Sequence, residues 1–451
     1  MRLPVVGSAY AHGRTEVTAR AAKNLWFERR PDGEKAPVIV SHLPAAVQYT
    51  FSQTVDAPFA FISTDVGYYY VATTTKLFGM SPGSGIVTFN NSFPVSHLTG
   101  LRMDYASDDT RIVMVTFATA SYCAVTGGAI TEITVEGQTP VSVAYLKGYF
   151  VMLMESGRLY WSTDGSTWNA LDYANAEYSP DAGRKIVALG NVLIIFGAKT
   201  IEYWAPTGNV DLPFEPIPEA VIRMGLRSSR AAVMIDGQVY FWGAPDNGTQ
   251  GLFTLDGTTP VRLSPPDLEL ILSVANVLTP TVSGFSIQGR KVIALQMVPS
   301  DEVYWLDLAS GAITRIPPGS PFSGRCEYIS DGIAVYGLSE ARDNHFRLDP
   351  TTFDATVERE LITDHVVTPD LDRFTVDKVR LDVAAGGNVA LAVSRDGGQT
   401  WGTERSAPAS AGQGVRGTVS FDRYGTANQF TFRLRATGKL ILSNIIINPK
   451  N

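Results

Sequence analysis

A repeat of apolar runs limits most strongly how this chain can fold. Between residues 60 and 357 a run of aromatic and aliphatic residues recurs, and each is followed by a turn, a second apolar run and a further turn. The seven leading runs are Gly67–Val71, Arg111–Val115, Gly148–Met152, Asn191–Ile195, Gln238–Trp242, Lys291–Leu295 and Gly332–Tyr336. Near-continuous apolar runs of this length are expected for strands covered on both faces.

The spacing of the turns that end these units indicates how the strands are arranged. The turns lie at Gly85, Gly127, Gly165, Gly208, Gly257, Gly311 and Pro350. Their separation averages about 44 residues, within the period of roughly 40–50 residues that is typical of β-propeller blades. One four-stranded sheet cannot bury both of its faces, whereas sheets packed radially around an axis can, and closing the ring leaves few free edges. We therefore expect an all-β protein with a β-propeller of six or seven blades over residues 60–357, and stacked sandwiches are the alternative.

The two ends of the chain lack this repeat. Residues 1–59 are expected to form an N-terminal arm that either completes a blade or lies outside the ring. In residues 358–451 apolar and charged residues alternate, as in Val379-Arg380-Leu381-Asp382-Val383. Such alternation is typical of a half-buried antiparallel sheet, and five strands in this region predict a C-terminal β-sandwich.

Composition excludes several classes of function. The net charge of −7 argues against binding DNA through phosphate neutralisation, which needs a basic surface. Cys123 and Cys326 are far apart in sequence and are expected to be buried thiols. The strongest apolar run, Val192–Phe196, falls far short of the ~20 residues that span a bilayer, so no membrane insertion is expected.

The sharpest local motif is a pair of Asp-boxes. Ser394-Arg395-Asp396-Gly397-Gly398-Gln399-Thr400-Trp401 matches the pattern Ser-x-Asp-x-Gly-x-Thr-Trp, which occurs in sialidases and many other β-proteins, and Ser162-Thr163-Asp164-Gly165-Ser166-Thr167-Trp168 is a shortened copy. Each residue type suits a turn: the carboxylate accepts backbone N–H bonds, glycine adopts unusual backbone angles, and tryptophan packs beneath the hairpin. We expect Ser394, Asp396, Gly398, Thr400, Trp401, Ser162, Asp164, Gly165 and Trp168 to be structural.

A catalytic role is the main alternative for a propeller that carries Asp-boxes. Sialidase-like hydrolysis needs an arginine cluster, a Tyr–Glu nucleophile pair and a separate acid, and no local pattern marks such a set. The five histidines have no zinc-ligand spacing, and no spaced carboxylates form a calcium loop. We expect no enzyme activity, cofactor or metal, with a glycosidase or a glycan-binding propeller as alternatives.

Several segments together resemble the packaged-DNA stabilisation, or tail hub (nozzle), proteins of short-tailed bacteriophages. The order of a glycine-containing tip, a Pro-Phe segment, a glycine, a tryptophan-bearing strand and a Gly-x-x-Pro-x-x-x-Ser closure is similar to theirs. The segments are Asn24–Glu28, Tyr203–Gly208, Leu212–Pro218, Ile222–Gly225, Asp236–Gly243, Leu255–Ser264, Val303–Asp307, Ser394–Gly402 and Phe421–Gly425.

The resemblance implies a structural virion protein that is assembled in the bacterial cytoplasm. It implies a ring of several copies, with six as the expected number, below the portal and adaptor proteins, which extends the DNA channel and helps to retain the packaged genome. It further implies contacts with tail spikes or fibres and with a tail plug, and no sequence-specific contact with DNA. Pro213 and Phe214 are candidates for a contact between subunits, and the alternative is that Phe214 fills a gap between blades.

Overall fold

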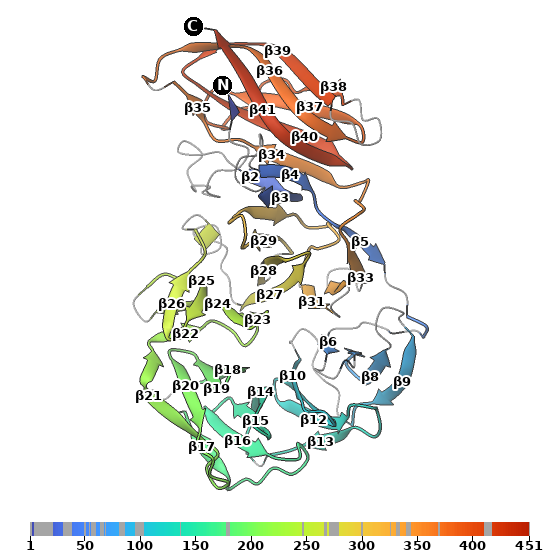
Figure 1. Ribbon diagram of the computed structural model, residues 1–451, viewed down its shortest axis with the longest axis vertical. Coiled ribbons are helices and arrows are strands. Elements are labelled where there is room, and N and C mark those ends of the chain that lie inside the picture. The colour runs from blue at the N-terminus through green and yellow to red at the C-terminus, as the bar shows by residue number, and fades with distance from the viewer. Residues whose placement is uncertain are drawn as a thin grey trace.

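The computed structural model describes most of the chain, and nearly all regular structure in it is β-strand (Figure 1). The described residues are 2–3, 21–29, 38–48, 51–53, 55, 60–63, 67, 69–80, 86–94, 103–135, 137–176, 181–245, 248–265, 268–269, 279–298, 301–324, 326–330, 334–339, 344–368, 370–409 and 417–450.

Seven antiparallel sheets surround a common centre and make a β-propeller. Blade 1 contains β6 (Ala60–Ser63), β7 (Tyr69–Ala72), β8 (Lys76–Met80) and β9 (Val87–Ser92). Blade 2 contains β10 (Asp104–Ser107), β11 (Arg111–Thr116), β12 (Thr119–Ala124) and β13 (Thr131–Ile133). Blade 3 contains β14 (Pro140–Leu146), β15 (Tyr149–Met154), β16 (Arg158–Ser162) and β17 (Tyr173–Asn175). Blade 4 contains β18 (Gly183–Leu189), β19 (Val192–Gly197), β20 (Ile201–Pro206) and β21 (Phe214–Ile222).

Two of the remaining blades are irregular: blade 5 has an interrupted inner strand, and blade 7 takes its outer strand from the N-terminal part of the chain. In blade 5 the inner strand is interrupted, and its strands are β22 (Met224–Leu226), β23 (Ala232–Ile235), β24 (Gln238–Pro245), β25 (Gly251–Asp256) and β26 (Thr259–Arg262). Blade 6 contains β27 (Thr279–Ile287), β28 (Arg290–Val298), β29 (Val303–Asp307) and β30 (Ile313–Ile316). Blade 7 contains β31 (Cys326–Ser330), β32 (Val335–Ser339), β33 (Asn344–Asp349) and, from the N-terminal part of the chain, β5 (Ala45–Gln48).

Each of the seven apolar runs of the sequence overlaps the second strand of a blade within the described residues, and these strands are β7, β11, β15, β19, β24, β28 and β32. The second strand has a hydrogen-bonded neighbour on each side and a neighbouring blade over each face, so both of its faces are buried. The predicted propeller is thus confirmed, and it has seven blades. Cys123 in β12 is buried, while the side chain of Cys326 lies outside the described part of the structure.

Pairing between distant segments closes the ring. β5 pairs antiparallel with β33, with Leu348 opposite Ala46, and so becomes the outer strand of blade 7. The inner strands β31 and β6 are in contact, which brings blade 7 against blade 1.

The C-terminal region forms the predicted antiparallel β-sandwich. One sheet has the order β3 (Leu25–Arg29), β4 (Val38–His42), β41 (Leu440–Lys450), β36 (Phe374–Ala385) and β39 (Gly417–Ala427), with β1 (Arg2–Leu3) paired to β41. The other has β2 (Ala21–Lys23), β34 (Glu358–Ile362), β40 (Gln429–Thr437), β37 (Asn388–Ser394) and β38 (Arg405–Pro408), with β35 (Val366–Val367) beside β40. Inward-facing side chains of both sheets form one core, with Phe430, Phe432 and Ile445 fully buried in it.

The N-terminal segment is therefore divided between the two parts of the molecule. We expected residues 1–59 to form an arm that either completes a blade or lies outside the ring, and the described strands do both: β5 completes blade 7, whereas β1 to β4 belong to the sandwich. Local sequence does not signal this division, because β2 and β5 have three and four residues and acquire their place through partners far away in the chain.

A continuous sheet joins the propeller to the sandwich. β2 pairs in parallel with β30 of blade 6 and antiparallel with β34, so hydrogen bonding runs from β27 through to β38. In Figure 1 the sandwich, in orange and red, lies beyond blade 6 at one side of the ring.

Candidate functional site

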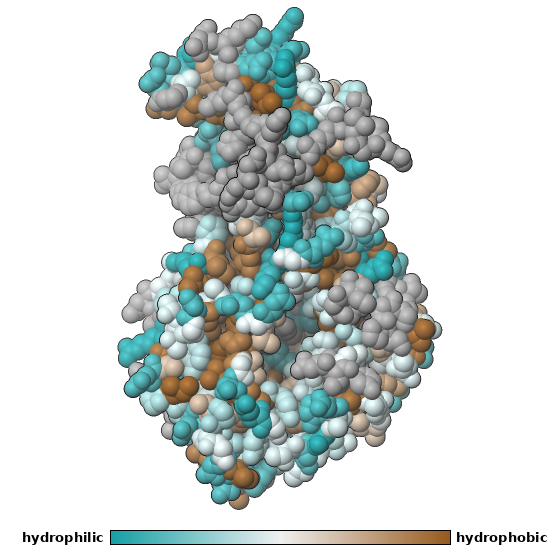
Figure 2. Space-filling view, viewed as in Figure 1, coloured by the Kyte–Doolittle hydropathy of each residue, from teal (hydrophilic) through white to brown (hydrophobic). Residues whose placement is uncertain are grey.

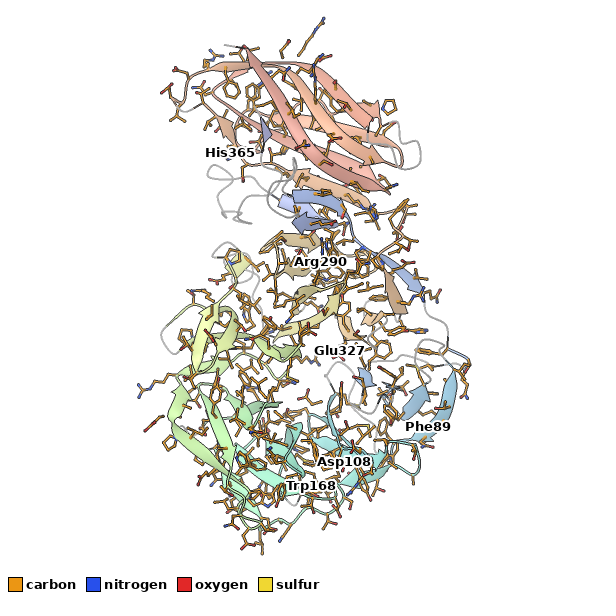
Figure 3. All side chains as sticks on the ribbon, viewed as in Figure 1. Phe89, Asp108, Trp168, Arg290, Glu327 and His365 are labelled. Atoms are coloured by element: carbon orange, nitrogen blue, oxygen red, sulfur yellow. The ribbon has the colours of Figure 1, made fainter. Side chains whose placement is uncertain are left out.

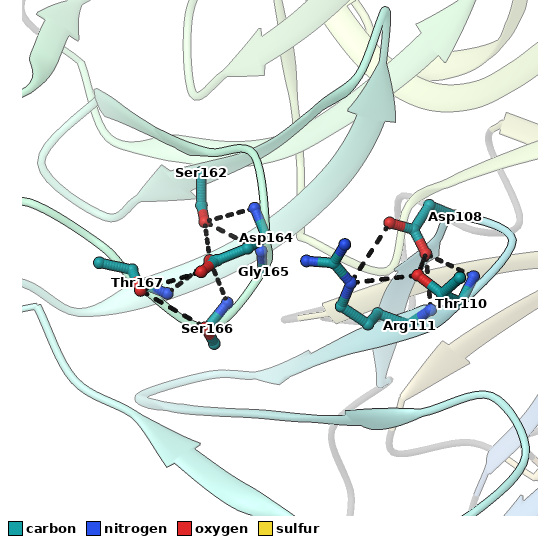
Figure 4. A network of polar contacts seen from close by, with 8 residues as sticks. All are labelled: Asp108, Thr110, Arg111, Ser162, Asp164, Gly165, Ser166 and Thr167. Carbon is teal, nitrogen blue, oxygen red and sulfur yellow. Dashed lines mark hydrogen bonds and ion pairs between the residues drawn. The ribbon is translucent and has the colours of Figure 1, made fainter.

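The first Asp-box lies at the end of β16 in blade 3 and forms a closed network of hydrogen bonds (Figure 4). Oδ1 of Asp164 accepts bonds from the backbone N–H groups of Ser166, at 2.8 Å, and Thr167, at 2.7 Å. Ser162 Oγ donates to the same carboxylate oxygen at 3.0 Å and accepts the N–H of Gly165 at 2.9 Å. Trp168 Nε1 donates to the Gly165 carbonyl at 2.9 Å. The polar groups of this box are thus directed into the turn itself.

The glycine of this turn also packs against the neighbouring blade. Gly165 has a φ of 69°, and a Cβ atom placed on it would lie 3.0 Å from Cγ2 of Val113 in β11. A side chain there would press on blade 2, so the residue suits both the turn and the contact between blades.

The second Asp-box follows β37 in the sandwich and has the same design. Ser394 Oγ donates to Asp396 Oδ1 at 2.6 Å and accepts the N–H of Gly398 at 2.8 Å. Thr400 bonds to the carboxylate through its backbone N–H, at 2.9 Å, and through its hydroxyl. The guanidinium of Arg433 lies 4.5 Å from the centre of the Trp401 ring.

Both carboxylates are held in the ionised form by these bonds. For Asp164, burial opposes ionisation, but the bonds donated by Thr167, Ser166 and Ser162 outweigh it and hold the pKa well below its usual range. The hydrogen bond from Ser394, followed by those from Thr400, lowers the pKa of Asp396 to about 2. Neither carboxyl is poised to exchange a proton near neutral pH, as a general acid or base must.

The corner Phe421–Gly425 lies beside the second Asp-box and is fixed by arginines. Arg395 donates to the Tyr424 carbonyl at 2.6 Å, and Arg405 donates to the carbonyls of Asp422 and Arg423. Arg423 and Gly425 both have positive φ, at 64° and 76°, so β39 bends here. The bend and the two guanidinium groups occupy backbone acceptors of a strand at the edge of its sheet, which limits pairing with other strands.

The structure does not support the predicted subunit contact at Pro213 and Phe214. Both residues are buried, and Phe214 is only 2% exposed, within the hydrophobic core shared by blades 3 and 4. Its ring meets that of Tyr149 edge-on, with centroids 6.0 Å apart. Phe214 therefore fills the gap between two blades, because its strand directs the ring inward. The exposed apolar residues of this segment are Val210 and Leu212, in the loop before it.

The centre of the propeller is a small cavity of about 500 Å³ lined by the inner strands of all seven blades. Figure 2 shows the depression at this position, and Glu327 points toward it in Figure 3. Lys185 Nζ lies 2.7 Å from Asp104 Oδ1 in a nearly buried ion pair. Ser142 donates to the same carboxylate at 2.5 Å and accepts the N–H of Ile186 at 3.1 Å. This network joins the inner strands of blades 2, 3 and 4.

The described lining of this cavity does not contain the arginine cluster that sialidase-like catalysis needs. Its charged lining residues are Asp104, Lys185 and Glu327, and no arginine is among the described residues around it. Among the residues with described positions, no group of three or more His, Cys, Asp or Glu side chains could hold a metal ion. No helix in the described ranges is long and apolar enough to cross a membrane.

The junction between propeller and sandwich is built from residues 24–28. The backbone N–H of Asn24 donates to the Arg315 carbonyl of β30 at 3.0 Å, and its side chain donates to the Glu358 carbonyl of β34 at 2.9 Å. Trp26 packs edge-on against Trp305 with ring centroids 6.2 Å apart. Arg290, labelled in Figure 3, lies over the Trp26 ring and donates to the Phe27 carbonyl at 3.1 Å.

Comparison with known families matches residues 2–282, well over half of the chain, to the family described as phage stabilisation, "Bacteriophage P22 Gp10, beta-propeller". The chain belongs to this phage stabilisation family. It is accordingly a structural phage protein of the virion, and the resemblance seen in the sequence is confirmed. Comparison with curated proteins gives no match.

Solved structures similar to this member of the phage stabilisation family are more distant. BamB from Moraxella catarrhalis is 14% identical, with 74% of this chain and 96% of that chain covered and a TM-score of 0.41. YCF48 from Cyanidioschyzon merolae is 12% identical, with 68% and 100% covered and a TM-score of 0.44. Similarity at this level says nothing about function.

The segments that resemble the phage stabilisation family have structural roles. A Cβ atom on Gly225 would overlap the carbonyl oxygen of Ala198, so only glycine lets β22 approach blade 4 this closely. Trp242 is buried in the core between blades. Ser264 Oγ accepts the N–H of Leu252 at 2.9 Å and donates to Glu269, which also binds Arg262. Gly225 and Trp242 thus hold neighbouring blades together, Asn24 joins the propeller to the sandwich, and the remaining contacts stabilise blade 5 and the sandwich internally.

Proposed function

We propose that this protein is the tail hub, or nozzle, of a short-tailed phage. In this proposal several copies, most simply six, form a ring below the portal and adaptor proteins. The ring extends the DNA channel, helps to retain packaged DNA, and anchors tail spikes or fibres and a closing plug. Membership of the phage stabilisation family carries the proposal.

The continuous sheet between the two parts of the chain supports a mechanical role. Because β30, β2 and β34 are hydrogen-bonded in one sheet and Trp26 packs on Trp305, force applied to the sandwich reaches the propeller through many bonds at once. A protein that links a pressurised capsid to its appendages needs such a connection.

The size of the central cavity argues that DNA passes between copies and not through the propeller. About 500 Å³ lined by side chains cannot accommodate a duplex whose major groove alone is about 12 Å wide. The channel would then be the hole at the centre of the ring of copies. We propose that the protein's excess of negative charge faces this hole, since a repulsive wall lets DNA slide instead of adhering.

A propeller glycosidase and a glycan-binding propeller are the other functions that the sequence allowed. The arginine cluster that would bind a substrate carboxylate is not found among the described residues of the central cavity. The carboxylates of both Asp-boxes are occupied within their own turns. These observations favour the hub.

Imaging of the purified virion tail by electron cryo-microscopy, with this chain fitted to the density, tests the proposal. We expect copies of the chain in a ring below the portal and adaptor, with appendages attached to it. Density for the chain at another place in the particle, or as isolated copies without a ring, would refute the hub. Carboxylates that point away from the channel would refute only the proposal about its charge.

A further inference from the structure

The chain crosses between the sandwich and the propeller twice, and the two connections contact each other. Following the described strands, residues 43–44 lead from β4 of the sandwich to β5 of blade 7, and residues 350–357 lead from β33 of blade 7 back to β34 of the sandwich. His42 is the last residue of β4, and its ring meets that of Phe353 in the second connection with centroids 5.2 Å apart. In Figure 1 both connections run along the same side of the junction, in blue and orange. His42 thus lies at the joint between the two parts of the molecule.

A buried arginine holds the second connection in place. Arg359 in β34 is only 1% exposed, and its guanidinium donates to the carbonyls of Val357, at 2.8 Å, and Asp354, at 3.1 Å. The N–H of Gly438, between β40 and β41, donates to the same Val357 carbonyl at 3.2 Å. Both acceptors of the guanidinium are uncharged carbonyls, and burial lowers the pKa of Arg359 to about 10. The joint therefore already contains one positive charge that is kept away from water, which is costly.

The ring of His42 can take up a proton at the same joint. Its Nδ1 lies 3.3 Å from the Leu440 carbonyl, and because a carbonyl only accepts, Nδ1 carries the proton of the neutral ring. A second proton would bind at Nε2. Burial lowers the pKa of His42 below its ordinary value of about 6.5, although the hydrogen bond to Leu440 opposes this in part, and the positive charges of Arg359 and Lys439 lower the pKa further.

The elements packed against His42 supply positive charge and apolar surface. Arg359 lies on β34, Lys439 comes directly before β41, and Leu25 is opposite His42 on β3. The second connection contributes Asp354, but Oδ1 of this carboxylate accepts the N–H and the hydroxyl of Thr356, at 2.8 and 2.7 Å, and its charge acts on Arg359. An imidazolium at this position would therefore meet two like charges in a half-buried site, which disfavours the charged form.

We propose that His42 is a proton-operated latch, which holds the two connections together when it is neutral and loosens the joint between propeller and sandwich when it is protonated. Protonation at Nε2 places a second positive charge beside the buried guanidinium of Arg359, and separation of the two connections relieves the repulsion by letting water reach both groups. The cores of the propeller and the sandwich do not contain His42 and stay folded. This inference goes beyond the proposed hub and does not depend on it.

The direction of the pKa shift decides at which pH the latch opens. Because the closed joint lowers the pKa of His42, the closed state binds the proton more weakly than the open state does. The closed joint is fully favoured above the ordinary histidine pKa of about 6.5 and loses stability as the pH falls below it. Ordinary carboxyl groups titrate near pH 4, so a comparison of pH 7.5 with pH 5.0 reports mainly on histidine.

Hydrogen–deuterium exchange of the full-length chain at these two pH values, corrected for the intrinsic exchange rates, tests the latch. In the wild type, protection of peptides covering residues 38–48 and 350–362 should fall several-fold at the lower pH, while protection of the second strands of the blades stays unchanged. His42→Gln keeps a side-chain N–H that can donate to Leu440 but does not titrate, so its protection should be the same at both pH values.

His365→Gln is the matched control. His365 is also partly buried, but its Nδ1 bonds to Thr431 at 2.7 Å within the sandwich, and this variant should respond to acid as the wild type does (Figure 3). Equal protection of the wild-type connections at both pH values would overturn the proposal. An acid response that persists in His42→Gln, or that His365→Gln removes, would overturn it as well.

A second measurement does not need a substitution at His42. In an NMR titration of the histidine rings of the folded wild type, the His42 signal should have its midpoint below about pH 6.5. Lys439→Gln should raise this midpoint, because it removes one of the two positive charges that act on the ring. A midpoint at or above pH 6.5, or one that Lys439→Gln leaves unchanged, would show that the joint does not disfavour the proton and that His42 is not a latch.

Discussion

The carboxylate of each Asp-box stabilises its turn by accepting hydrogen bonds, and for Asp396 this stabilisation should depend on pH. Its pKa, lowered to about 2 by hydrogen bonds from Ser394 and Thr400, lies below the ordinary value of about 3.9 in an unfolded chain. A group with a lowered folded-state pKa stabilises the fold above its unfolded-state pKa, and this stabilisation is lost as pH falls through the folded-state pKa.

We therefore expect Asp396→Asn to lower the free energy of unfolding at pH 6, with the difference from the wild type shrinking between pH 4 and pH 2. Urea unfolding at a series of pH values, followed by tryptophan fluorescence, measures this. A difference that stays constant over the whole range would mean that the ionised carboxylate is not what holds the turn.

Gly225 is a residue whose lack of a side chain is required. Gly225→Ala places a methyl group against the Ala198 carbonyl, and blade 5 must move away from blade 4. Overpacking of this kind costs about 1–3 kcal/mol. Gly387→Ala is the matched control, since a Cβ atom there meets nothing within 4 Å. Chemical unfolding of both variants should show a large loss for the first and little for the second.

At the scale of strands, substitutions at Lys185 and Asp104, which form an ion pair at the propeller axis, should have non-additive effects on stability. Lys185→Met removes the cation from Asp104, and breaking a nearly buried pair on one side typically costs about 3–5 kcal/mol. The double variant Lys185→Met/Asp104→Asn should recover part of the loss, because no isolated charge remains. Additive losses in the denaturant midpoints of the single and double variants would contradict the coupling.

The sequence predicted the elements that depend on a local pattern. The second strands of the blades are continuous apolar runs because they are covered on both faces, and the alternation in β36 and β40 reports a sheet with one buried face. The short strands β2 and β5 carry no such pattern, since their positions are set by partners hundreds of residues away.

For the site, residue types were informative about turns but not about surfaces. The Asp-boxes were recognisable because every residue in them has a role in one turn. Phe214, Val210 and Leu212 are all apolar and close in sequence, and only the direction of β21 and the loop before it decides which are buried. The exposure of Val210 and Leu212 could not be predicted from residue type, because an apolar residue is normally expected in the hydrophobic core.

For the whole molecule, the junction predicts that propeller and sandwich unfold together. The sheet from β30 to β34 and the ring contacts of Trp26 tie the two cores, so heating the wild type should give a single calorimetric transition. Trp26→Ala should cost about 3–5 kcal/mol and divide the transition in two. Leu171→Ala, an exposed control, should leave one transition. Two transitions in the wild type would mean that the domains are independent.

The path of the N-terminal segment also has a consequence for biosynthesis. Asn24 leaves the ribosome 334 residues before Glu358, to which it binds, and β5 must wait in the same way for β33. Early strands thus remain without their partners until translation is nearly complete. A product that ends before β33 would have an open ring and would retain only β1 to β4 of the sandwich, so we expect that only chains translated beyond these partners are incorporated into the particle.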